Sequence, residues 1–591
     1  MADSGGTKRV RRSKGHTFRV WAPNAGRAEI VAGGNVSALD MSSSGWFEGH
    51  IADAGPNTDY GFILDGQGPY PDPRSAWQPE GIDGPSRLVD HAAYKWTDGA
   101  WTGRPLRSAV IYELHVGTFT PEGTFNGVIT RLPYLKELGV NAIELMPVNQ
   151  FPGSRGWGYD GASLFAPHNT YGAPDDLKRL VDLCHSHGIS VIQDVVYNHL
   201  GPAGNHLSKY GPYFTDRYST PWGDAVNLDG PDSDEVRRFF IDNALMWLGD
   251  YHFDGIRIDA VHALTDMSAM HLVEEIVHSV RALEARAGRT LWVIAESDLN
   301  DPRVVRAPEL GGFGADAQWS DDLHHSLHSV ITGEDRGYYA DFGYVSQVAK
   351  SLREAFVYSG RRSTFRGRKH GRPTTGLTGD RFLAYSQNHD QVGNRALGER
   401  TAALVSPDLL KIAAAIIITS PFIPMLFQGE EWGAGTPFLY FTDHSDPALG
   451  RAVTEGRRTE FEGFGWSEHT IPDPQNQDTF EWSILSWEEQ EDPKHAELLD
   501  WYKSLLALRR TTPDLADGRM DAVATRYDEK EKWLVVERGA ITVACNFSKS
   551  KAKVPLPAAR TAETLLVSAE TPGRTGIIVQ LPPESVTIYS A

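Results

Sequence analysis

The chain has 591 residues, more than one hydrophobic core usually supports, so we expect one large domain with two smaller companions. Forty per cent of the residues are hydrophobic and 16 are Trp, a composition that excludes a disordered chain. The formal net charge of −20 argues against a nucleic acid or an anionic membrane as partner, because polyanions are bound by concentrated Lys and Arg.

The cysteines and the N-terminal segment bear on the cellular compartment. Cys184 and Cys545 lie in apolar contexts far apart in the sequence, which predicts buried free thiols and a reducing compartment. Residues 1–18 are charged and contain no apolar stretch typical of a secretion signal. The sequence contains no run of about 18 or more apolar residues, the length that a membrane-spanning helix needs. We therefore expect a cytoplasmic protein without a membrane partner.

The first predicted domain is a small β-sandwich over residues 1–94. From His16 to Tyr94 short alternating runs, such as TFRVWAP and AEIVAGG, are interrupted by Gly, Pro and Asn about every 8–12 residues. The Pro- and Gly-rich passage at 66–86 is interpreted as an ordered connector to the next domain.

The second predicted domain, residues 95–512, is a (β/α)8 TIM barrel of the α/β class. From Ser108 short buried strands alternate with amphipathic helices, such as those at 127–139 and 175–188, which is typical of a parallel sheet. A helix at 495–511 completes the domain. The eight strand candidates match a closed barrel better than an open sheet: AVIYELHV, NAIELMP, ISVIQDVV, FDGIRID, LWVIAES, GADAQWS, FLAYSQNHD and PFIPMLFQG.

Two further segments complete the chain. Residues 200–230 are too long for an ordinary βα loop, so we expect them to form a lid subdomain inserted in the barrel. Over 513–591 the sequence returns to alternating apolar runs, among them WLVVERG, ITVACNFS and SVTIYS. This pattern predicts a second β-sandwich at the C-terminus.

Polar and ionisable residues stand where the predicted barrel strands end, which is where barrel enzymes carry their reactive groups. Hydrolysis of an acetal needs two carboxyl groups, one to protonate the leaving oxygen and one to attack or to activate water. The strand ends supply both kinds of group: Asp194, His199, Arg257, Asp259, Glu296, His389 and Asp390.

The surroundings of two carboxyl groups differ in a way that predicts their roles. Arg257 precedes Asp259 by two residues on the same face of a strand, so it can hold that carboxylate ionised, which suits a nucleophile. Glu296 follows the apolar run LWVIA and would neighbour two other acids, which favours its protonated form and suits a general acid.

Four strings resemble the signature regions of the α-amylase superfamily. The resemblance implies that Asp259 is the nucleophile, that Glu296 is the acid/base, and that Asp390 binds sugar hydroxyls more tightly in the transition state. The strings are DVVYNH (194–199), GIRIDAVH (255–262), IAESD (294–298) and SQNHDQVGN (386–394).

The same resemblance assigns the groups around the cleaved sugar. Arg257, His199 and His389 would line its subsite, and Tyr159 in WGYD (157–160) would stack beneath it. The resemblance runs over the whole chain, and the segment FRVWAPNAGRAEIV is similar to the carbohydrate-module-like domain of branching, debranching and trehalose-releasing members. We do not expect that module to bind sugar here.

Longer strings resemble the maltooligosyltrehalose trehalohydrolases within this superfamily. They lie at 81–90, 157–182, 320–343, 387–400 and 424–434. The resemblance implies a retaining hydrolase acting on maltooligosyltrehalose and related α-glucans, which cleaves the α-1,4 bond next to the terminal trehalose. It would release trehalose and a maltooligosaccharide.

Two alternatives remain open at this point. A glycogen branching or debranching enzyme would share the domain order and the acids. A non-catalytic glucan-binding protein would be expected to lack one of Asp259, Glu296 and Asp390, and all three are present.

The leaving trehalose needs its own pocket, because two glucoses joined α,α-1,1 are compact and bent. By resemblance the candidates for that pocket are Trp222, Tyr338, Phe365 and Arg366. His262 stands where amylases often carry a Lys, and we include it among the substrate-binding residues.

The expectation for cofactors rests on what the motifs lack. Many α-amylases fix a calcium ion with a His just beyond the nucleophile segment, where this chain has Ala263. No DxDxDG loop and no clustered Cys/His spacing occurs. We therefore predict no required metal and no cofactor.

Overall fold

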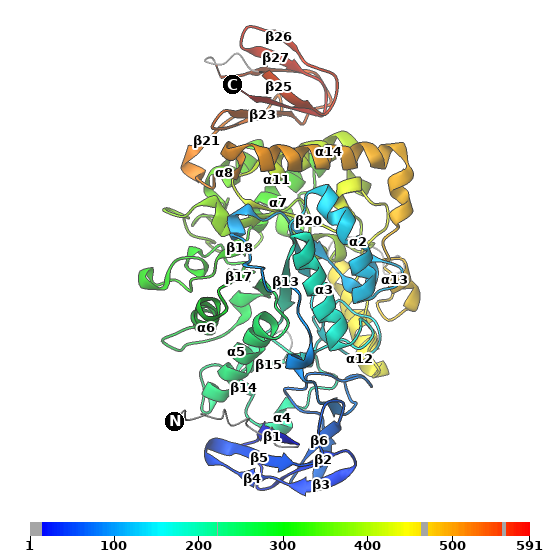
Figure 1. Cartoon of the computed structure of the whole chain (residues 1–591). Helices are drawn as coiled ribbons and strands as arrows, with labels where there is room; N and C mark the ends of the chain where they lie inside the picture. The colour runs from blue at the N-terminus through cyan, green and yellow to red at the C-terminus, as the bar shows by residue number, and fades with distance from the viewer. Residues whose placement is uncertain (1–14, 221–222, 463–470, 558–562, 591) are drawn as a thin grey trace, which may run out of the picture.

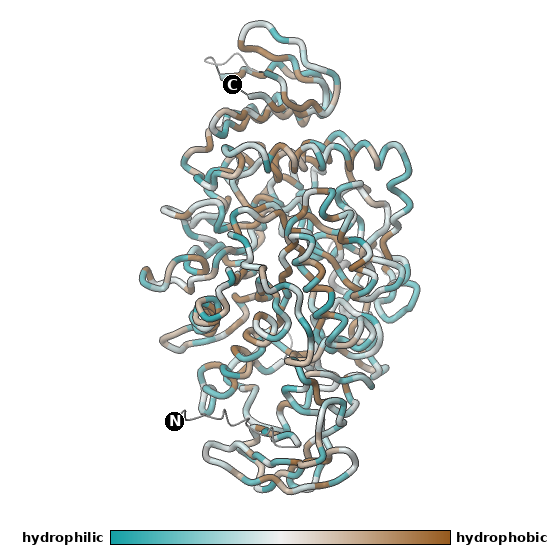
Figure 2. Tube along the Cα trace, in the orientation of Figure 1, coloured by the Kyte–Doolittle hydropathy of each residue, from teal (hydrophilic) through white to brown (hydrophobic). Residues whose placement is uncertain are grey.

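The computed structural model describes residues 15–220, 223–462, 471–557 and 563–590. Three β-containing regions follow one another along the long axis of the molecule, with the largest in the middle (Figure 1). Apolar segments gather inside the middle region and in the C-terminal sheets, whereas the outlying loops are of mixed hydropathy (Figure 2). Within the described ranges every helix is too short or too polar to cross a lipid bilayer.

The middle region is a closed barrel of eight parallel strands, as the sequence predicts. Each of the eight predicted runs contains one strand, and the strands pair in chain order until the last returns to the first. The strands are buried on both faces because helices cover the outside and side chains fill the inside. They are β9 (Ile111–Leu114), β10 (Ala142–Leu145), β13 (Ser190–Val195), β16 (Gly255–Ile258), β17 (Trp292–Ala295), β18 (Ala317–Trp319), β19 (Phe382–Ala384) and β20 (Ile423–Phe427).

Amphipathic helices alternate with these strands and bury their apolar faces against them. The helix α3 begins at Pro174, whose fixed φ suits a first turn, and ends before Gly188, whose φ of 77° reverses the chain into β13. The helices are α1 (Val116–Phe119), α2 (Phe125–Leu138), α3 (Pro174–His187), α5 (Ser233–Gly249), α6 (Leu272–Ala287), α7 (Asp321–Thr332), α8 (Val345–Glu354), α9 (His389–Gly393), α10 (Thr401–Leu404), α11 (Pro407–Thr419), α12 (Pro447–Glu462), α13 (Gln477–Glu481), α14 (Pro493–Thr511) and α15 (Pro513–Ala516).

The N-terminal region consists of two small sheets, in the orders β1-β5-β4 and β3-β2-β6-β7, and β8 also pairs with β6. Both β7 and β8 overlap the passage 66–86, so the interpretation of that passage as a connector alone is wrong at its two ends. One edge of β6 pairs with β2, and the backbone groups of its other edge pair with these short segments. The strands are β1 (His16–Trp21), β2 (Ala28–Ala32), β3 (Asn35–Ala38), β4 (Asp40–Met41), β5 (Trp46–Ile51), β6 (Asp59–Leu64), β7 (Gln67–Tyr70) and β8 (Ser86–Arg87).

The insertion at 200–230 connects the N-terminal region to the barrel. It contains α4 (Leu207–Tyr210) and the hairpin of β14 (Phe214–Thr220) and β15 (Gly223–Val226). The hydroxyl of Tyr210 donates to the carbonyl of Pro71 at 2.7 Å, and the ring of Tyr213 packs edge-on against Trp21. A second two-stranded sheet, β11 (Asn149–Gln150) with β12 (Ser163–Pro167), lies in the loop after β10.

The C-terminal region has a five-stranded sheet, β21-β22-β23-β28-β25, and a three-stranded sheet, β24-β27-β26. The first sheet contacts α8 and α11 of the barrel domain. Cys545 in this sheet and Cys184 in α3 are buried free thiols, as predicted. The strands are β21 (Val523–Asp528), β22 (Trp533–Arg538), β23 (Ile541–Asn546), β24 (Ala552–Pro555), β25 (Glu563–Val567), β26 (Gly573–Thr575), β27 (Ile578–Leu581) and β28 (Ser585–Ser590).

Candidate active site

The barrel brings several of the predicted residues to one cavity of about 520 Å³ at the carboxyl ends of its strands. Asp259 follows β16, Glu296 follows β17, and Asp390 lies in α9, which comes after β19. The cavity is lined by Trp157, Tyr159, Asp160, His199, Asp259, Ala260, Glu296, His389, Asp390, Asn394, Tyr440, Val453, Gly456 and Arg457.

A fully buried guanidinium lies beneath the cavity and joins three carboxyl groups. Nη1 of Arg257 donates to both oxygens of Asp194, at 2.8 and 2.7 Å, and to Oδ1 of Asp259 at 2.9 Å. Nη2 lies 2.8 Å from Oε2 of Glu296, and the ring of Trp319 covers the guanidinium face at 4.1 Å. Charge-assisted bonds of this kind fix the relative positions of the carboxyl groups.

Asp259 is held on both of its oxygens. Oδ1 accepts from Arg257, and Oδ2 accepts from the amide of Asn198 at 3.1 Å. Burial raises the pKa of Asp259, and the Arg257 cation opposes that effect. The arrangement presents an oriented carboxylate to the cavity, as a nucleophile requires.

Glu296 lies beside Asp259 in a setting that favours its protonated form. Burial raises the pKa of Glu296, and the charge of Asp259 adds to this effect against the pull of Arg257. Its Oε2 accepts from the backbone N–H of Ala260, a residue with the unusual φ of 39°. Asp259 and Glu296 contact the two terminal nitrogens of the same guanidinium, at 2.9 and 2.8 Å, so their carboxyl groups face one cavity side by side.

An aromatic ring and an imidazole form one wall of the cavity. The rings of Tyr159 and His389 stack with centroids 5.2 Å apart. The Tyr159 hydroxyl donates to Oδ2 of Asp194 at 2.7 Å and lies 2.8 Å from Nε2 of His389. Asp390 accepts from the amide of Asn394 at 3.1 Å, and its Oδ1 lies 3.6 Å from Nε2 of His389.

Of the residues predicted for the leaving trehalose, Tyr338, Phe365 and Arg366 lie outside this cavity lining. Arg366 forms an ion pair with Asp298, two residues after Glu296, through Nη1 at 2.7 Å. Tyr338 packs against the ring of His325, and the side chain of Phe365 is 52% exposed. Trp222 lies outside the described residues.

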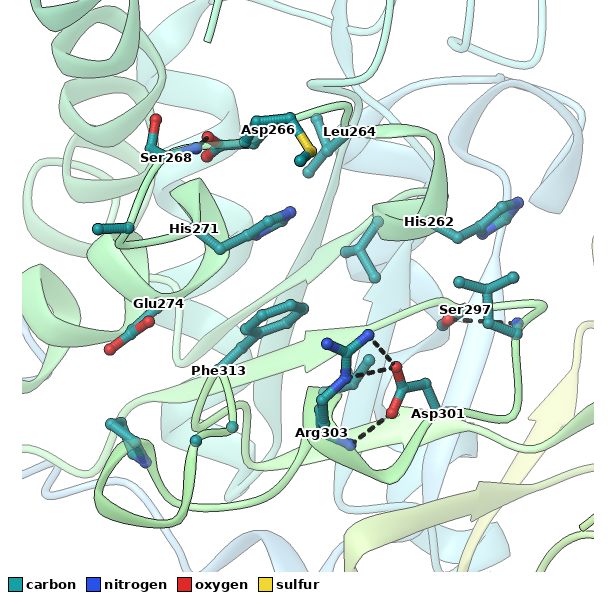
Figure 3. Close-up of a pocket in the computed structure, with 18 residues that line it drawn as sticks. His262, Leu264, Asp266, Ser268, His271, Glu274, Ser297, Asp301, Arg303 and Phe313 are labelled. Atoms are coloured by element: carbon teal, nitrogen blue, oxygen red, sulfur yellow. Dashed lines mark hydrogen bonds and ion pairs between the residues drawn. The ribbon is translucent and has the colours of Figure 1, made fainter. Parts of the chain in front are cut away.

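His262 lines a second cavity of about 570 Å³, together with Ser297, which follows Glu296 (Figure 3). In this cavity the rings of Phe313 and His271 stack at 4.3 Å, and Arg303 is paired with Asp301. His262 also accepts a hydrogen bond from the backbone N–H of Asp298, at 3.3 Å. The structure therefore places His262 in the lining of the second cavity and not in that of the first.

Sequence reasoning missed several residues that belong to this site. Asn198 donates a hydrogen bond to Asp259, and it lies within the quoted string DVVYNH, which could have pointed to it. Asp321 follows β18 in the same manner as the predicted acids follow their strands. Burial, joined by the charges of Glu296, Asp298 and Asp390, raises the pKa of Asp321 to about 7. Glu113 in β9 contacts His389 and had no signal of this kind.

Within the part of the chain that the structure describes, no three His, Cys, Asp or Glu side chains are grouped so that they could hold a metal ion. The carboxyl groups of the cavity are instead bound by Arg257, by amides and by backbone N–H groups.

Comparisons with known proteins agree with this geometry. A family model described as the α-amylase catalytic domain matches residues 85–217, and a model for a domain of unknown function, DUF3459, matches residues 518–588. The chain is 46% identical to the malto-oligosyltrehalose trehalohydrolase of Rhizobium sp. (strain M-11), over 97% of each chain. It is 49% identical to that of Arthrobacter ramosus, over 91% of this chain and 94% of the relative.

Two solved structures extend the comparison. A crystal structure from Salmonella typhimurium, of a protein provisionally described as an α-amylase, has a TM-score of 0.89 and 37% identity over 97% of each chain. A pullulanase from Paenibacillus barengoltzii, in complex with maltohexaose and α-cyclodextrin, has a TM-score of 0.74 at 18% identity, over 100% of this chain and 96% of that one. The second likeness concerns the fold alone.

Proposed function

We propose that Asp259, Glu296 and Asp390 are the catalytic carboxyl groups of this chain, which belongs to the malto-oligosyltrehalose trehalohydrolase family of the α-amylase superfamily. The chain is a glycosidase that cleaves maltooligosyltrehalose. The bond hydrolysed is the α-1,4 bond next to the terminal trehalose, and the products are trehalose and a shortened maltooligosaccharide.

The observation that carries these roles is the sharing of one guanidinium by Asp259 and Glu296. Retaining glycosidases need two closely spaced carboxyl groups, one ionised and one protonated. Arg257 and Asn198 hold Asp259 oriented for attack, whereas burial and the neighbouring charge of Asp259 favour a proton on Glu296.

In the first step a carboxylate oxygen of Asp259 attacks C1 of the sugar whose α-1,4 bond is cut. The bond from C1 to the oxygen of trehalose breaks, and that oxygen takes the proton of Glu296. Trehalose leaves, and the maltooligosyl group remains as an ester on Asp259. In the second step the Glu296 carboxylate takes a proton from water, the water oxygen bonds to C1, and Asp259 is released.

The remaining residues position the substrate in this proposal. Tyr159 stacks beneath the cleaved sugar, and His199, His389 and Asp390 bond its hydroxyls, because all four line the same cavity. We place trehalose on the side of Glu296 where Arg366 and Asp298 pair. Its pocket would be completed by the three other predicted residues: Trp222, Tyr338 and Phe365.

Product analysis tests the function directly. The purified protein is incubated with maltotriosyl-trehalose and, separately, with maltopentaose and amylopectin. We expect free trehalose as the main early product and much slower cleavage of the other two substrates. Preferential release of linear chains from amylopectin, or new branches in amylose, would instead indicate a debranching or branching activity with the same carboxyl groups.

A further inference from the structure

A buried carboxylate lies beneath the active site and takes no part in the mechanism described so far. Glu113, in β9, is 1% exposed. Its Oε2 accepts from the backbone N–H of His389 at 2.9 Å, and its Oε1 makes a short contact with Nδ1 of the same residue. Glu113 thus bonds His389 twice from below, while the ring of His389 reaches the cavity.

The protons of the neighbouring groups can be assigned from the contacts. Asp194 accepts two bonds from Arg257, so it is a carboxylate and the Tyr159 hydroxyl must donate its single proton to it. The Tyr159 oxygen is then an acceptor toward Nε2 of His389, which must carry a proton. Nδ1 faces Oε1 of Glu113, and with Glu113 ionised Nδ1 carries a proton and donates it there. Both ring nitrogens are protonated, so the ring is an imidazolium.

We propose that Glu113 is a positioning residue that keeps His389 as an imidazolium beside the cleaved sugar, and that this cation keeps Asp390 ionised. Nε2 of His389 lies 3.6 Å from Oδ1 of Asp390. An ionised Asp390 accepts hydrogen bonds from sugar hydroxyls and stabilises the positive charge that develops on the sugar ring. The inference rests on the proposed function only for this role of Asp390.

The charges around His389 agree with the proton assignment. Burial disfavours the cation, but the charges of Glu113 and Asp390 outweigh it and raise the pKa of His389 to about 9. Burial also raises the pKa of Asp390, and the His389 cation is the first charge that opposes it. The titratable groups that face His389 come from its own helix and from the elements packed around it: Glu113, His115, Glu144, Tyr159, Asp194, Arg257 and Asp390.

The neighbouring strand offers a matched control. Glu144, in β10, pairs directly with Glu113 across the sheet and is also fully buried. Among the described residues its carboxyl oxygens have no hydrogen-bond partner, and burial raises the pKa of Glu144 well above its ordinary value. Both substitutions replace a buried carboxyl group by an amide of the same size. Glu144→Gln leaves the charge unchanged because Glu144 is neutral, whereas Glu113→Gln removes the anion that faces His389.

The test is the pH dependence of kcat/KM for trehalose release from maltotriosyl-trehalose, which reports groups of the free enzyme. In Glu113→Gln we expect the alkaline limb to move down by at least about one pH unit and kcat at about pH 7.5 to fall roughly 10- to 100-fold. KM should change less than kcat. In Glu113→Asp the alkaline limb should return most of the way to its wild-type pH. Glu144→Gln should show the wild-type pH profile and kcat. A Glu113→Gln profile that is lower but has the wild-type limb would overturn the proposal.

A second measurement does not need activity. In protein labelled with [15N]histidine, the His389 signal is assigned by its loss in His389→Gln. At about pH 7.5 we expect two protonated ring nitrogens in the wild type and one in Glu113→Gln. A neutral His389 ring in the wild type contradicts the proposal even if Glu113→Gln does not fold. Absence of trehalose release by the wild type would instead count against the proposed function.

Discussion

At the scale of single residues, the site is organised by Arg257. This fully buried cation donates hydrogen bonds to Asp194 and Asp259 and forms an ion pair with Glu296, so all three carboxyl groups lie against the same planar group. A buried ion network of this kind is costly to break, because removal of one partner leaves a desolvated charge. A Lys at position 257 could not replace Arg257, because its ammonium is a single point charge. It lacks the two separate terminal nitrogens that contact Asp259 and Glu296.

The role of the nucleophile predicts the behaviour of Asp259→Asn. An amide cannot form the glycosyl ester, so turnover should fall by at least about 1,000-fold. The fold should persist, because Asn fills the same volume and Arg257 keeps its contacts with Asp194 and Glu296. Trehalose release and the thermal unfolding temperature check the two statements together. Retained activity in a correctly folded variant would contradict the assignment of Asp259.

The pH dependence of activity should respond to Asp321, whose pKa burial raises to about 7. Above that pH its negative charge faces Glu296 and disfavours a second charge there, which raises the pKa of Glu296. Asp321→Asn removes this effect, so Glu296 should lose its proton at lower pH. The alkaline limb of kcat/KM, to which Glu296 and His389 both contribute, should then move down by a few tenths of a pH unit, roughly what one partly screened charge produces. The exposed Asp335 supplies the control variant Asp335→Asn. An unshifted limb would mean that Asp321 does not act on the acid.

At the scale of elements, tight packing between α9 and the loop after β10 positions the aromatic wall of the cavity. Gly393, at the end of α9, lies so close to Trp157 that an added Cβ would come within 2.1 Å of the indole ring. The indole has no room to retreat, because it stacks on Phe438 and donates to the carbonyl of Leu439. Small size at position 393 is therefore a condition for placing Tyr159 and His389.

Substitution of Gly393 by Ala tests this packing. The added methyl group should displace Trp157, lower kcat/KM about 10- to 100-fold and destabilise the fold by about 1–3 kcal/mol. Steady-state kinetics and thermal unfolding measure the two effects. Gly99→Ala is the control, because its added Cβ has no heavy atom within 4 Å. Wild-type kinetics in Gly393→Ala would show that the wall is not sensitive to this contact.

At the scale of the whole molecule, the flanking regions are attached to the barrel by specific polar contacts. The insertion after β13 holds the N-terminal sheets through Tyr210 and Tyr213. On the opposite side, the side chain of Arg538 in β22 is 3% exposed and donates to the carbonyls of Thr419 and Ser420 at the end of α11. Arg509 of α14 donates to the same Ser420 carbonyl. Two cations therefore bind carbonyl groups at the C-terminal end of α11, where the helix dipole is negative.

Loss of the Arg538 contacts should therefore weaken the attachment of the C-terminal sheets. Arg538→Ala leaves buried carbonyls unpaired and should lower the free energy of unfolding by about 2–4 kcal/mol. Activity at room temperature should stay near the wild-type value, because the cavity is built from other elements. Thermal unfolding followed with an activity assay separates the two effects. The exposed Arg519 gives the control Arg519→Ala, for which we expect an unchanged unfolding temperature. Equal unfolding of both variants would exclude this role for Arg538.

Much of this architecture could be predicted from the sequence because its signals are local. The barrel strands are short apolar runs, and Asp259 and Glu296 directly follow two of them, so strand ends and reactive groups were visible together. The eight runs and their closed order are confirmed by the structure. The assignment of the individual site residues stays a prediction that the experiments above test.

Only the tertiary structure decided which distant residues meet. Glu113 and His389 are 276 positions apart and touch because closure of the barrel brings β9 next to β20 and under α9. Arg366 reaches Asp298 across 68 positions of sequence that include β18, α7 and α8, and no periodicity in either segment indicates this pairing. Local patterns determine which segments become strands and what chemistry stands at their ends. The register of a closed sheet and the packing of its loops depend on the whole chain, and they determine how those groups are charged and oriented.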